Sequence, residues 1–106
     1  MGVTLHFQST GTVPGNARPV EMVGGAISVG RGAENDLVLP DPSKVLSKRH
    51  CAIEDHGGNV VVVDLSTNGT FLNGKRLTPY LPHVLNNKDE IRVGRLFMRI
   101  HIAEAL

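Results

Sequence analysis

Several features that mark common protein classes are scarce in this chain of 106 residues. Cys51 is its single cysteine, so no internal disulfide can form, and this suits a reducing compartment. No stretch approaches the roughly 20 apolar residues of a membrane span, and the N-terminus lacks a charged-then-apolar signal pattern. With 11 basic and 10 acidic residues the net charge is +1, which gives no electrostatic reason to expect nucleic acid. We therefore expect a soluble, cytoplasmic domain with neither a membrane nor a nucleic-acid partner.

Helical periodicity is missing as well, because apolar residues nowhere recur at i, i+3, i+4 and i+7 over three turns. Short apolar runs broken by Gly, Pro and Asn are typical of an all-β sandwich or barrel. The composition, 41% hydrophobic and 20% charged, fits one globular domain over residues 1–106. The runs that we predict as strands are 3–8, 20–23, 26–29, 37–39, 51–54, 60–63, 70–72, 75–77, 91–93 and 96–102, with a loop at 9–15 and a loop or edge segment around Pro79 and Pro82.

Residues 64–74 carry the densest turn signals in the sequence. Two Asn-Gly dipeptides, at 68–69 and 73–74, favour tight turns because both residue types tolerate positive φ. They leave room for only a three-residue strand between them. The first turn would hold residues 66–68 at the rim of a sheet, with two hydroxyls and an amide displayed. This arrangement indicates a binding loop rather than a plain connector.

Three short segments share donors that suit an anion: 30–32 has a guanidinium, 47–50 a hydroxyl beside basic residues, and 66–69 a hydroxyl beside an amide. Each segment alone is more often a solvated turn than a site. Loops at one end of a sandwich, however, meet in space although they are far apart in sequence. The conjunction of the three segments therefore predicts a shared anion site.

These blocks resemble a known family. Gly30-Arg31, Asn35-Asp36-Leu37-Val38-Leu39, the run from Leu46 to Ile53 and the run from Asp64 to Gly74 together are similar to the forkhead-associated (FHA) domain. The resemblance implies an all-β sandwich of about eleven strands, with ligand loops at one end. It also implies an activity: binding phosphothreonine in partner proteins that are substrates of Ser/Thr kinases. The chain would then be a single FHA-like domain, and whether it is a fragment of a longer protein stays open, as does its oligomeric state.

The resemblance assigns five residues to the phosphopeptide: Arg31, Ser47, Lys48, Thr67 and Asn68. The rigid donor fork of Arg31 suits phosphate oxygens, and the hydroxyl of Ser47 can donate to the same group. Lys48 stands where the family commonly has arginine, so it keeps the charge but loses the bidentate geometry. Thr67 offers a hydroxyl or its N–H, and Asn68 matches the asparagine that grips the ligand main chain.

Four further residues match positions that support the site: Gly30, His50, Gly69 and Asn73. We expect the two glycines and the Asn73-Gly74 turn to act through backbone geometry. His50 matches a structural histidine that braces the loops by hydrogen bonds. The resemblance implies no cofactor and no catalytic residue.

A metal site is not indicated by the histidines. His50, Cys51, Asp55 and His56 are close in sequence, but neighbours in a strand point to opposite faces and the spacing is not that of a zinc site. Cys51 alternates with Ile53 on an inward face, so we predict a buried apolar role for it.

Two functions stay open from the sequence. The first is a phosphothreonine-dependent binding module without catalysis. The alternative is a scaffold domain that docks partners through a sheet face, independent of phosphate. No nucleophile–base pair stands out for an enzyme. The loop before Ser47, lengthened by Leu39-Pro40-Asp41-Pro42, also looks like that of FHA domains in type VI secretion accessory proteins, which implies a role in regulating that system.

Overall fold

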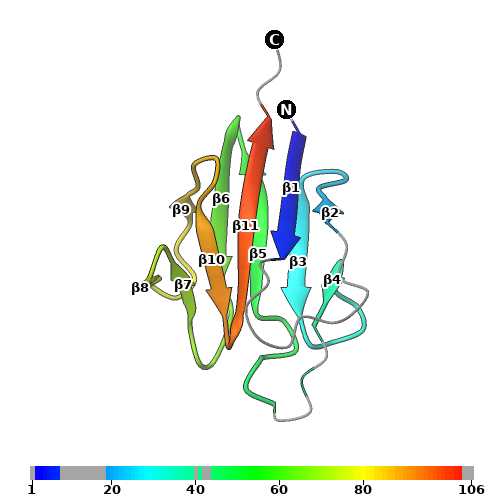
Figure 1. Ribbon diagram of the computed structural model, residues 1–106, viewed down its shortest axis with the longest axis vertical. Coiled ribbons are helices and arrows are strands. Elements are labelled where there is room, and N and C mark those ends of the chain that lie inside the picture. Colours follow the sequence, from blue (N-terminus) through cyan, green and yellow to red (C-terminus); the bar gives the residue numbers. More distant parts are fainter. Residues whose placement is uncertain (1, 8–18, 40, 42–43, 104–106) are drawn as a thin grey trace.

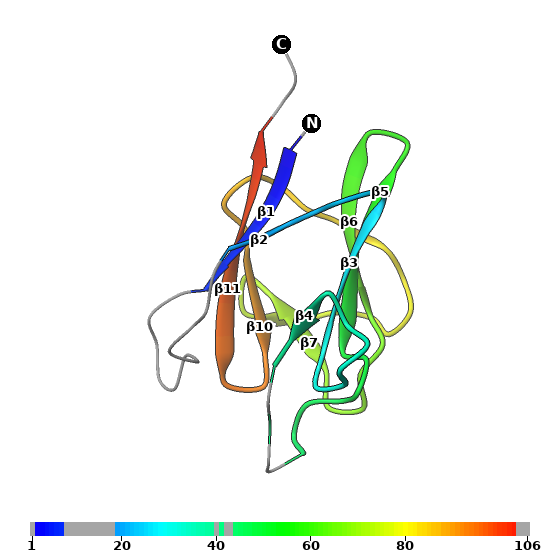
Figure 2. The same cartoon turned by 90° about the vertical axis from the view of Figure 1, so that its right-hand side faces the viewer.

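The computed structural model describes residues 2–7, 19–39, 41 and 44–103 of the chain. In these residues eleven strands form two sheets that pack face to face (Figures 1 and 2). The all-β sandwich of about eleven strands that the sequence implied is confirmed. The described part of the chain contains no helix that is long and apolar enough to cross a membrane. The loop expected at 9–15 and the side chain of Phe7, expected on the buried face, lie outside the described part.

The first sheet has six strands in the order β2-β1-β11-β10-β7-β8. These strands are β1 (Gly2–Phe7), β2 (Val20–Glu21), β7 (Thr70–Leu72), β8 (Lys75–Arg76), β10 (Glu90–Val93) and β11 (Leu96–Ala103). All pairs in this sheet are antiparallel. The centre is the long pair β1–β11, in which Leu5 lies opposite Ile100.

The second sheet has five strands in the order β4-β3-β5-β6-β9. These strands are β3 (Ala26–Gly30), β4 (Leu37–Val38), β5 (Cys51–His56), β6 (Asn59–Asp64) and β9 (His83–Val84). The pair β3–β4 is parallel and the others are antiparallel. Gly57 and Gly58, both at positive φ, form the two-residue turn between β5 and β6, which is the geometry that matches the twist of a hairpin.

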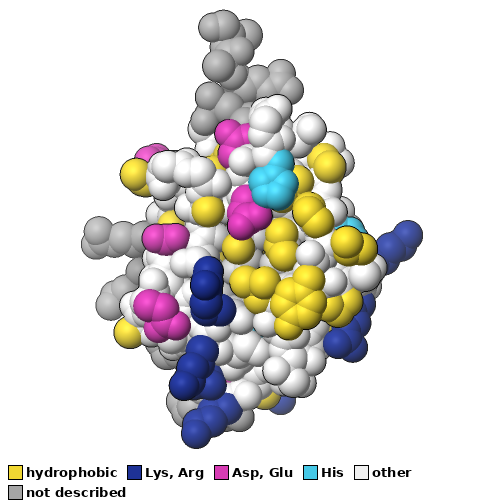
Figure 3. Space-filling view, turned by 180° about the vertical axis from the view of Figure 1, so that it is seen from behind, with side chains coloured by type: hydrophobic (Ala, Val, Ile, Leu, Met, Phe, Trp, Pro, Cys, Tyr) yellow, Lys and Arg dark blue, Asp and Glu magenta, His cyan; other side chains and the backbone are white. Residues whose placement is uncertain are grey.

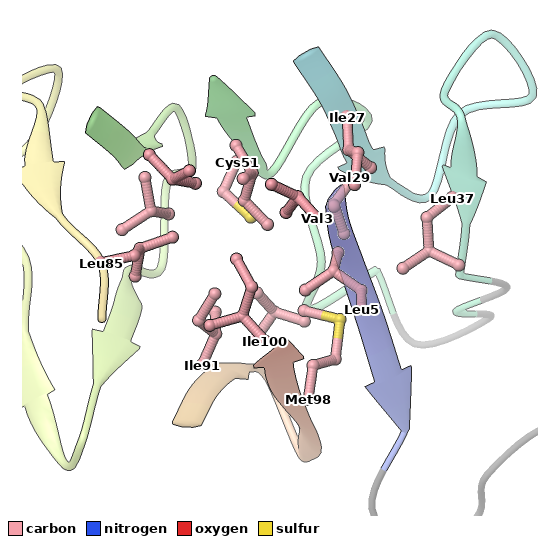
Figure 4. Packing of buried hydrophobic residues seen from close by; sticks show 14 of the residues in the cluster. Val3, Leu5, Ile27, Val29, Leu37, Cys51, Leu85, Ile91, Met98 and Ile100 are labelled. Carbon is pink, nitrogen blue, oxygen red and sulfur yellow. The ribbon is translucent and has the colours of Figure 1, made fainter. Parts of the chain in front are cut away.

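The core lies between the two sheets (Figure 4). Ile27, Val29 and Cys51 project from the five-stranded sheet toward Met98 and Ile100 of the other sheet (Figure 4). The period-2 alternation explains this, since residues two apart on a strand share a face. Burial raises the pKa of the Cys51 thiol to about 12, with the nearby Asp64 adding to the effect. Cys51 therefore stays a protonated, apolar core residue, as predicted.

Nearly every predicted strand differs from the structure by one or two residues at an end, and Thr70–Leu72 matches at both ends. The strand expected at 20–23 covers Val20–Glu21 only, and the one expected at 60–63 is longer, Asn59–Asp64. The segment near Pro79 and Pro82 continues into the short edge strand β9, which pairs with β6. A two-residue strand beside two prolines carries too little alternation to be predicted from sequence.

The outer face of the five-stranded sheet carries an apolar surface. Val60 and Val62 of β6 lie in the core, so Val61 and Val63 face outward, and Val61 lies opposite the exposed Val84. Tyr80 and Leu81, in the segment before β9, are 69% and 54% exposed. Figure 3 shows apolar side chains gathered on this face. An antiparallel sheet with one solvated face normally alternates apolar and polar residues, and β6 does not.

Asn73 fastens the β7–β8 hairpin to β10. Its backbone has φ +50°, its amide nitrogen donates to Asp89 Oδ1 at 3.0 Å, and its Oδ1 accepts from the N–H of Glu90 at 2.9 Å. We predict that Asn73→Ala lowers the free energy of unfolding by about 2 kcal/mol, because two hydrogen bonds and a tolerated positive φ are lost. Asn73→Gly, which keeps the φ, should cost less. Chemical denaturation of both variants checks this, and an equal loss would contradict a backbone contribution.

Candidate functional site

Three loops meet at one end of the sandwich, the lower end in Figure 1. They are residues 31–36 after β3, 44–50 before β5 and 65–69 after β6. The N–H of Arg31 donates to the carbonyl of Ser47 at 3.0 Å, and the N–H of Thr67 donates to Ser47 Oγ at 3.0 Å. The middle loop therefore binds both others, and the three sequence segments with anion-binding donors are brought together.

Gly30 allows the first two loops to approach. A Cβ at this position would lie 2.2 Å from the carbonyl oxygen of Lys48, so no other residue fits without moving the backbone. The same carbonyl accepts from the N–H of Gly32 at 3.0 Å and from Asn35 Nδ2 at 2.6 Å. Asn35, which is buried, was part of the sequence resemblance but had no predicted role. Its side chain closes the first loop onto the second.

His50 ties the second loop to the third. It is fully buried, its Nδ1 accepts from the N–H of Ser47 at 3.2 Å, and its Nε2 lies 2.9 Å from the carbonyl oxygen of Gly69. This pattern fixes the neutral ring with the proton on Nε2, which donates to Gly69. Burial lowers the pKa of His50, although the Gly69 bond and the charge of Asp64 act in the opposite direction.

Asp64, the last residue of β6, holds the third loop in place by hydrogen bonds to its carboxylate. Its Oδ1 accepts from the N–H and hydroxyl of Ser66, at 3.0 and 2.5 Å, and from the hydroxyl of Thr70 at 2.8 Å. Ser66 Oγ accepts in turn from the N–H of Gly69 at 2.8 Å. Asp64 is buried, and the sequence reading gave it no role. The signal was present, since Asp two residues before Ser is a typical Asx-turn pattern.

Arg31 and Ser47 keep donors for a ligand. Arg31 Nε donates to the carbonyl of Leu46 at 3.0 Å, which fixes the plane of the guanidinium. Within the described residues its two terminal nitrogens have no partner. Ser47 Oγ is the acceptor of the Thr67 N–H, so its own proton is free to donate elsewhere. Thr67 is exposed beside it.

Lys48 and Asn68 flank this pair on exposed backbone. Asn68 Nδ2 donates to the carbonyl of Val45 at 2.8 Å, which holds the amide in place and leaves its oxygen as an acceptor. Gly69, with φ +102°, turns the chain back into β7. Asn73, in contrast, lies at the other end of β7 from Thr70, so any support that it gives to the loops passes through the hairpin.

The electrostatics of the loop end favour an anion. Arg31, Lys48 and the exposed Arg49 make no ion pair with any described carboxylate. On the outer face of the five-stranded sheet, Lys and Arg side chains are grouped toward the loop end (Figure 3). The same region contains no cluster of three described His, Cys, Asp or Glu residues that could hold a metal ion. The site is therefore built from hydrogen-bond donors and positive charge.

The FHA domain family model matches residues 27–94, which include all three loops. The chain belongs to the FHA domain family. Among curated proteins, it is 36% identical over 78 residues to the ABC transporter ATP-binding/permease protein Rv1747 of Mycobacterium tuberculosis, covering 72% of this chain and 8% of that one. The chain spans 8–14% of the length of the first curated relatives.

Solved structures agree with this membership. The N-terminal FHA domain of Rad53 from Saccharomyces cerevisiae, in complex with a phosphothreonine peptide, is 26% identical with a TM-score of 0.81, covering 97% of this chain and 94% of that one. The FhaA FHA domain, complexed with the intracellular domain of Rv3910, is 30% identical with a TM-score of 0.76, covering 93% and 99%. The loops of this chain therefore sit on the same fold as the Rad53 domain that is in complex with a phosphothreonine peptide.

We predict that His50→Ala lowers the free energy of unfolding by about 2–4 kcal/mol, because it leaves a cavity and removes the partners of a part-buried N–H and a buried carbonyl. The melting temperature should fall by roughly 10 °C or more. Calorimetric melting measures the loss. A variant of normal stability that had nevertheless lost all ligand binding would contradict the bracing role.

The pH dependence of stability should also report on His50. Its folded pKa lies below the ordinary value of 6.5, so the unfolded chain takes up the proton first. The contribution of neutral His50 is thus full above about pH 6.5 and is lost as the pH falls toward the folded pKa, by up to about 1.4 kcal/mol per pH unit. Between pH 7.5 and 5 the free energy of unfolding, measured by chemical denaturation at each pH, should fall more steeply for the wild type than for His50→Ala. The same pH dependence in both proteins would contradict the assignment.

Proposed function

We propose that this FHA domain is a phosphothreonine-dependent protein-binding module with no catalysis of its own. The observation that carries the proposal is the convergence of the free guanidinium nitrogens of Arg31 with the Ser47 hydroxyl and Thr67, on loops already held in place. A dianionic phosphate can accept several charge-assisted hydrogen bonds at once, which a neutral side chain cannot.

Each predicted contact has a physical basis in this geometry. The plane of the Arg31 guanidinium is fixed by Leu46, so its two outer nitrogens can meet two phosphate oxygens together. Ser47 donates its hydroxyl proton while it accepts from Thr67. Lys48 adds a point charge. Asn68, anchored through Nδ2, presents its oxygen to an N–H of the ligand main chain.

The relatives support this proposal at the level of ligand class, because the Rad53 domain is described with a phosphothreonine peptide. The partner would then be a protein phosphorylated by a Ser/Thr kinase, and the domain would act in the cytoplasm, where such kinases work. The most specific part of the proposal is a role in regulating type VI secretion. It is supported only by the long loop before Ser47, of which residues 40 and 42–43 lie outside the described part.

A second candidate function, phosphate-independent docking through a sheet face, is favoured by one observation. The outer face of the five-stranded sheet exposes Val84, which lies opposite the outward-facing but buried Val61, and Tyr80 and Leu81 are exposed in the segment before β9. Exposed apolar groups of this kind mark interaction surfaces. A phosphothreonine peptide and its unphosphorylated twin separate the two functions, since only the first function needs the phosphate.

Arg31→Ala and Asn68→Ala should each weaken binding of a phosphothreonine peptide about ten- to a hundredfold, because each removes ligand-facing hydrogen bonds worth about 1.5–3 kcal/mol. Each side chain also donates one hydrogen bond to a carbonyl of the second loop, worth about 1 kcal/mol, so the melting temperature should fall by no more than roughly 4–8 °C. Isothermal titration calorimetry measures the affinities. Lys75→Ala, which removes an exposed positive charge on β8, is the control and should bind as the wild type does. Unchanged affinity in either test variant would reject that residue's assignment.

A further inference from the structure

His6 of β1 and His101 of β11 lie in contact on the outer face of the six-stranded sheet. The two strands run side by side (Figure 1), and the paired residues Leu5 and Ile100 lie in the core. Since successive side chains of a strand alternate between faces, His6 and His101 both point away from the core. Their ring centroids are 4.3 Å apart, with 60° between the ring planes. The sequence did not predict this contact, because it depends on the pairing of the first and last described strands.

The fold uses the ring nitrogens of the other three histidines. His50 bonds to two backbone groups, His56 to a glutamate, and His83 accepts from a backbone N–H. Within the described part of the chain, the nitrogens of His6 and His101 have no hydrogen-bond partner. The pair therefore presents unused imidazole nitrogens on two adjacent rings. Imidazole nitrogen is a favoured ligand of Zn²⁺, Ni²⁺ and Cu²⁺.

The charges around the two rings are compatible with a bound cation. Arg99 lies opposite His6 on the same face, but its guanidinium is engaged on the side of β10. There it donates to a backbone carbonyl, and its Nη2 lies 3.7 Å from Glu90 Oε2. On the other side, the exposed Glu21 of β2 lies in the same row of the sheet as His101, two strands away. The arginine charge is thus partly compensated, and a carboxylate adds negative charge to the face.

We propose that His6 and His101 form a binding site for a divalent transition metal of the Zn²⁺, Ni²⁺ and Cu²⁺ class. The site lies outside the three loops and goes beyond the proposed function. Metal–imidazole bonds are about 2.0–2.1 Å long, so two nitrogens on a tetrahedral metal lie about 3.3 Å apart. Rings with centroids 4.3 Å apart reach this separation by rotation about side-chain bonds. The strands need not move, so the site is organised before the metal binds.

The chain supplies two ligands to this site. The described residues contain no cluster of three His, Cys, Asp or Glu side chains that could hold a metal ion. Water completes the coordination, as it does at zinc sites that leave a position to solvent. Mg²⁺ and Ca²⁺ prefer oxygen ligands and should not bind here.

Titration calorimetry with ZnCl₂ measures the affinity of the wild-type domain, which should bind Zn²⁺ saturably and give no signal with MgCl₂. His6→Ala and His101→Ala should each weaken Zn²⁺ binding at least about tenfold, because even the hydrogen-bond partners of a metal ligand are worth about 10–100-fold. His56→Ala is the matched control. It removes an exposed histidine whose ring is held by Glu54, and it should bind Zn²⁺ as the wild type does.

Thermal melting separates metal binding from ring packing. Zn²⁺ should raise the melting temperature of the wild type, because a metal that binds the folded pair and not the unfolded chain stabilises the fold. His101→Phe keeps an aromatic ring against His6 but removes both nitrogens. Without metal it should melt near the wild-type temperature, and it should lose the response to Zn²⁺. A rise equal to that of the wild type would contradict a ligand role for His101.

Three results of the titrations would overturn the proposal. The first is absence of saturable Zn²⁺ binding by the wild type. The second is binding by both His6→Ala and His101→Ala as tight as that of the wild type, since the metal would then lie elsewhere. The third is an equal loss in His56→Ala, which would mean that surface histidines bind Zn²⁺ without a defined site. No peptide is present in these titrations, so failure of either proposal leaves the other standing.

Discussion

The binding end of this FHA domain depends on one buried imidazole. His50 accepts a hydrogen bond from the backbone of Ser47 and donates one to the backbone of Gly69. One side chain therefore satisfies polar groups on two loops that are not held together by strand pairing. Without it, the part-buried N–H of Ser47 and the buried C=O of Gly69 would each lack this partner, and an unsatisfied buried group costs more than an average hydrogen bond contributes. These two hydrogen bonds fix the second loop at Ser47 and the third loop at Gly69, which is the neighbour of Asn68.

Rigid loops matter here because a phosphopeptide makes few contacts. Binding has to offset the ordering of every side chain and loop that it immobilises, and loops ordered in advance reduce that cost. Gly30 lets the first loop approach the Lys48 carbonyl, and Asp64 holds the third loop through Ser66 and Thr70. The groups that face a ligand are oriented by separate contacts: Arg31 by the Leu46 carbonyl and Asn68 by the Val45 carbonyl. Asp64 and His50 only brace the loops, whereas Ser47 and Asn68 join the loops and also face the proposed ligand.

The sequence predicted much of this end of the molecule because its signals are local. Asn-Gly dipeptides specify tight turns by themselves, and the alternation around Cys51 and Ile53 specifies a buried face. Asp64 was missed although its Asx-turn signal is local, whereas the role of Asn35 depends on a distant contact with the Lys48 carbonyl. The contact of Arg76 with Gly69 likewise exists only because β8 returns beside β7. Such proximity is a property of the sheet order, and no spacing along the chain encodes it.

Arg92 and Arg76 both lie beside Phe71, but the fold uses their charges differently. The neighbouring sequence does not reveal this difference. An aromatic face and a carbonyl satisfy Arg92, so its charge is already compensated inside the fold. The guanidinium of Arg76 packs on the backbone of Gly69 and makes no hydrogen bond or ion pair with a described residue. Positive charge that the fold does not use raises the local concentration of anionic ligands and rejects cationic ones. Arg76 therefore adds to the positive field of the loop end in a way that Arg92 does not.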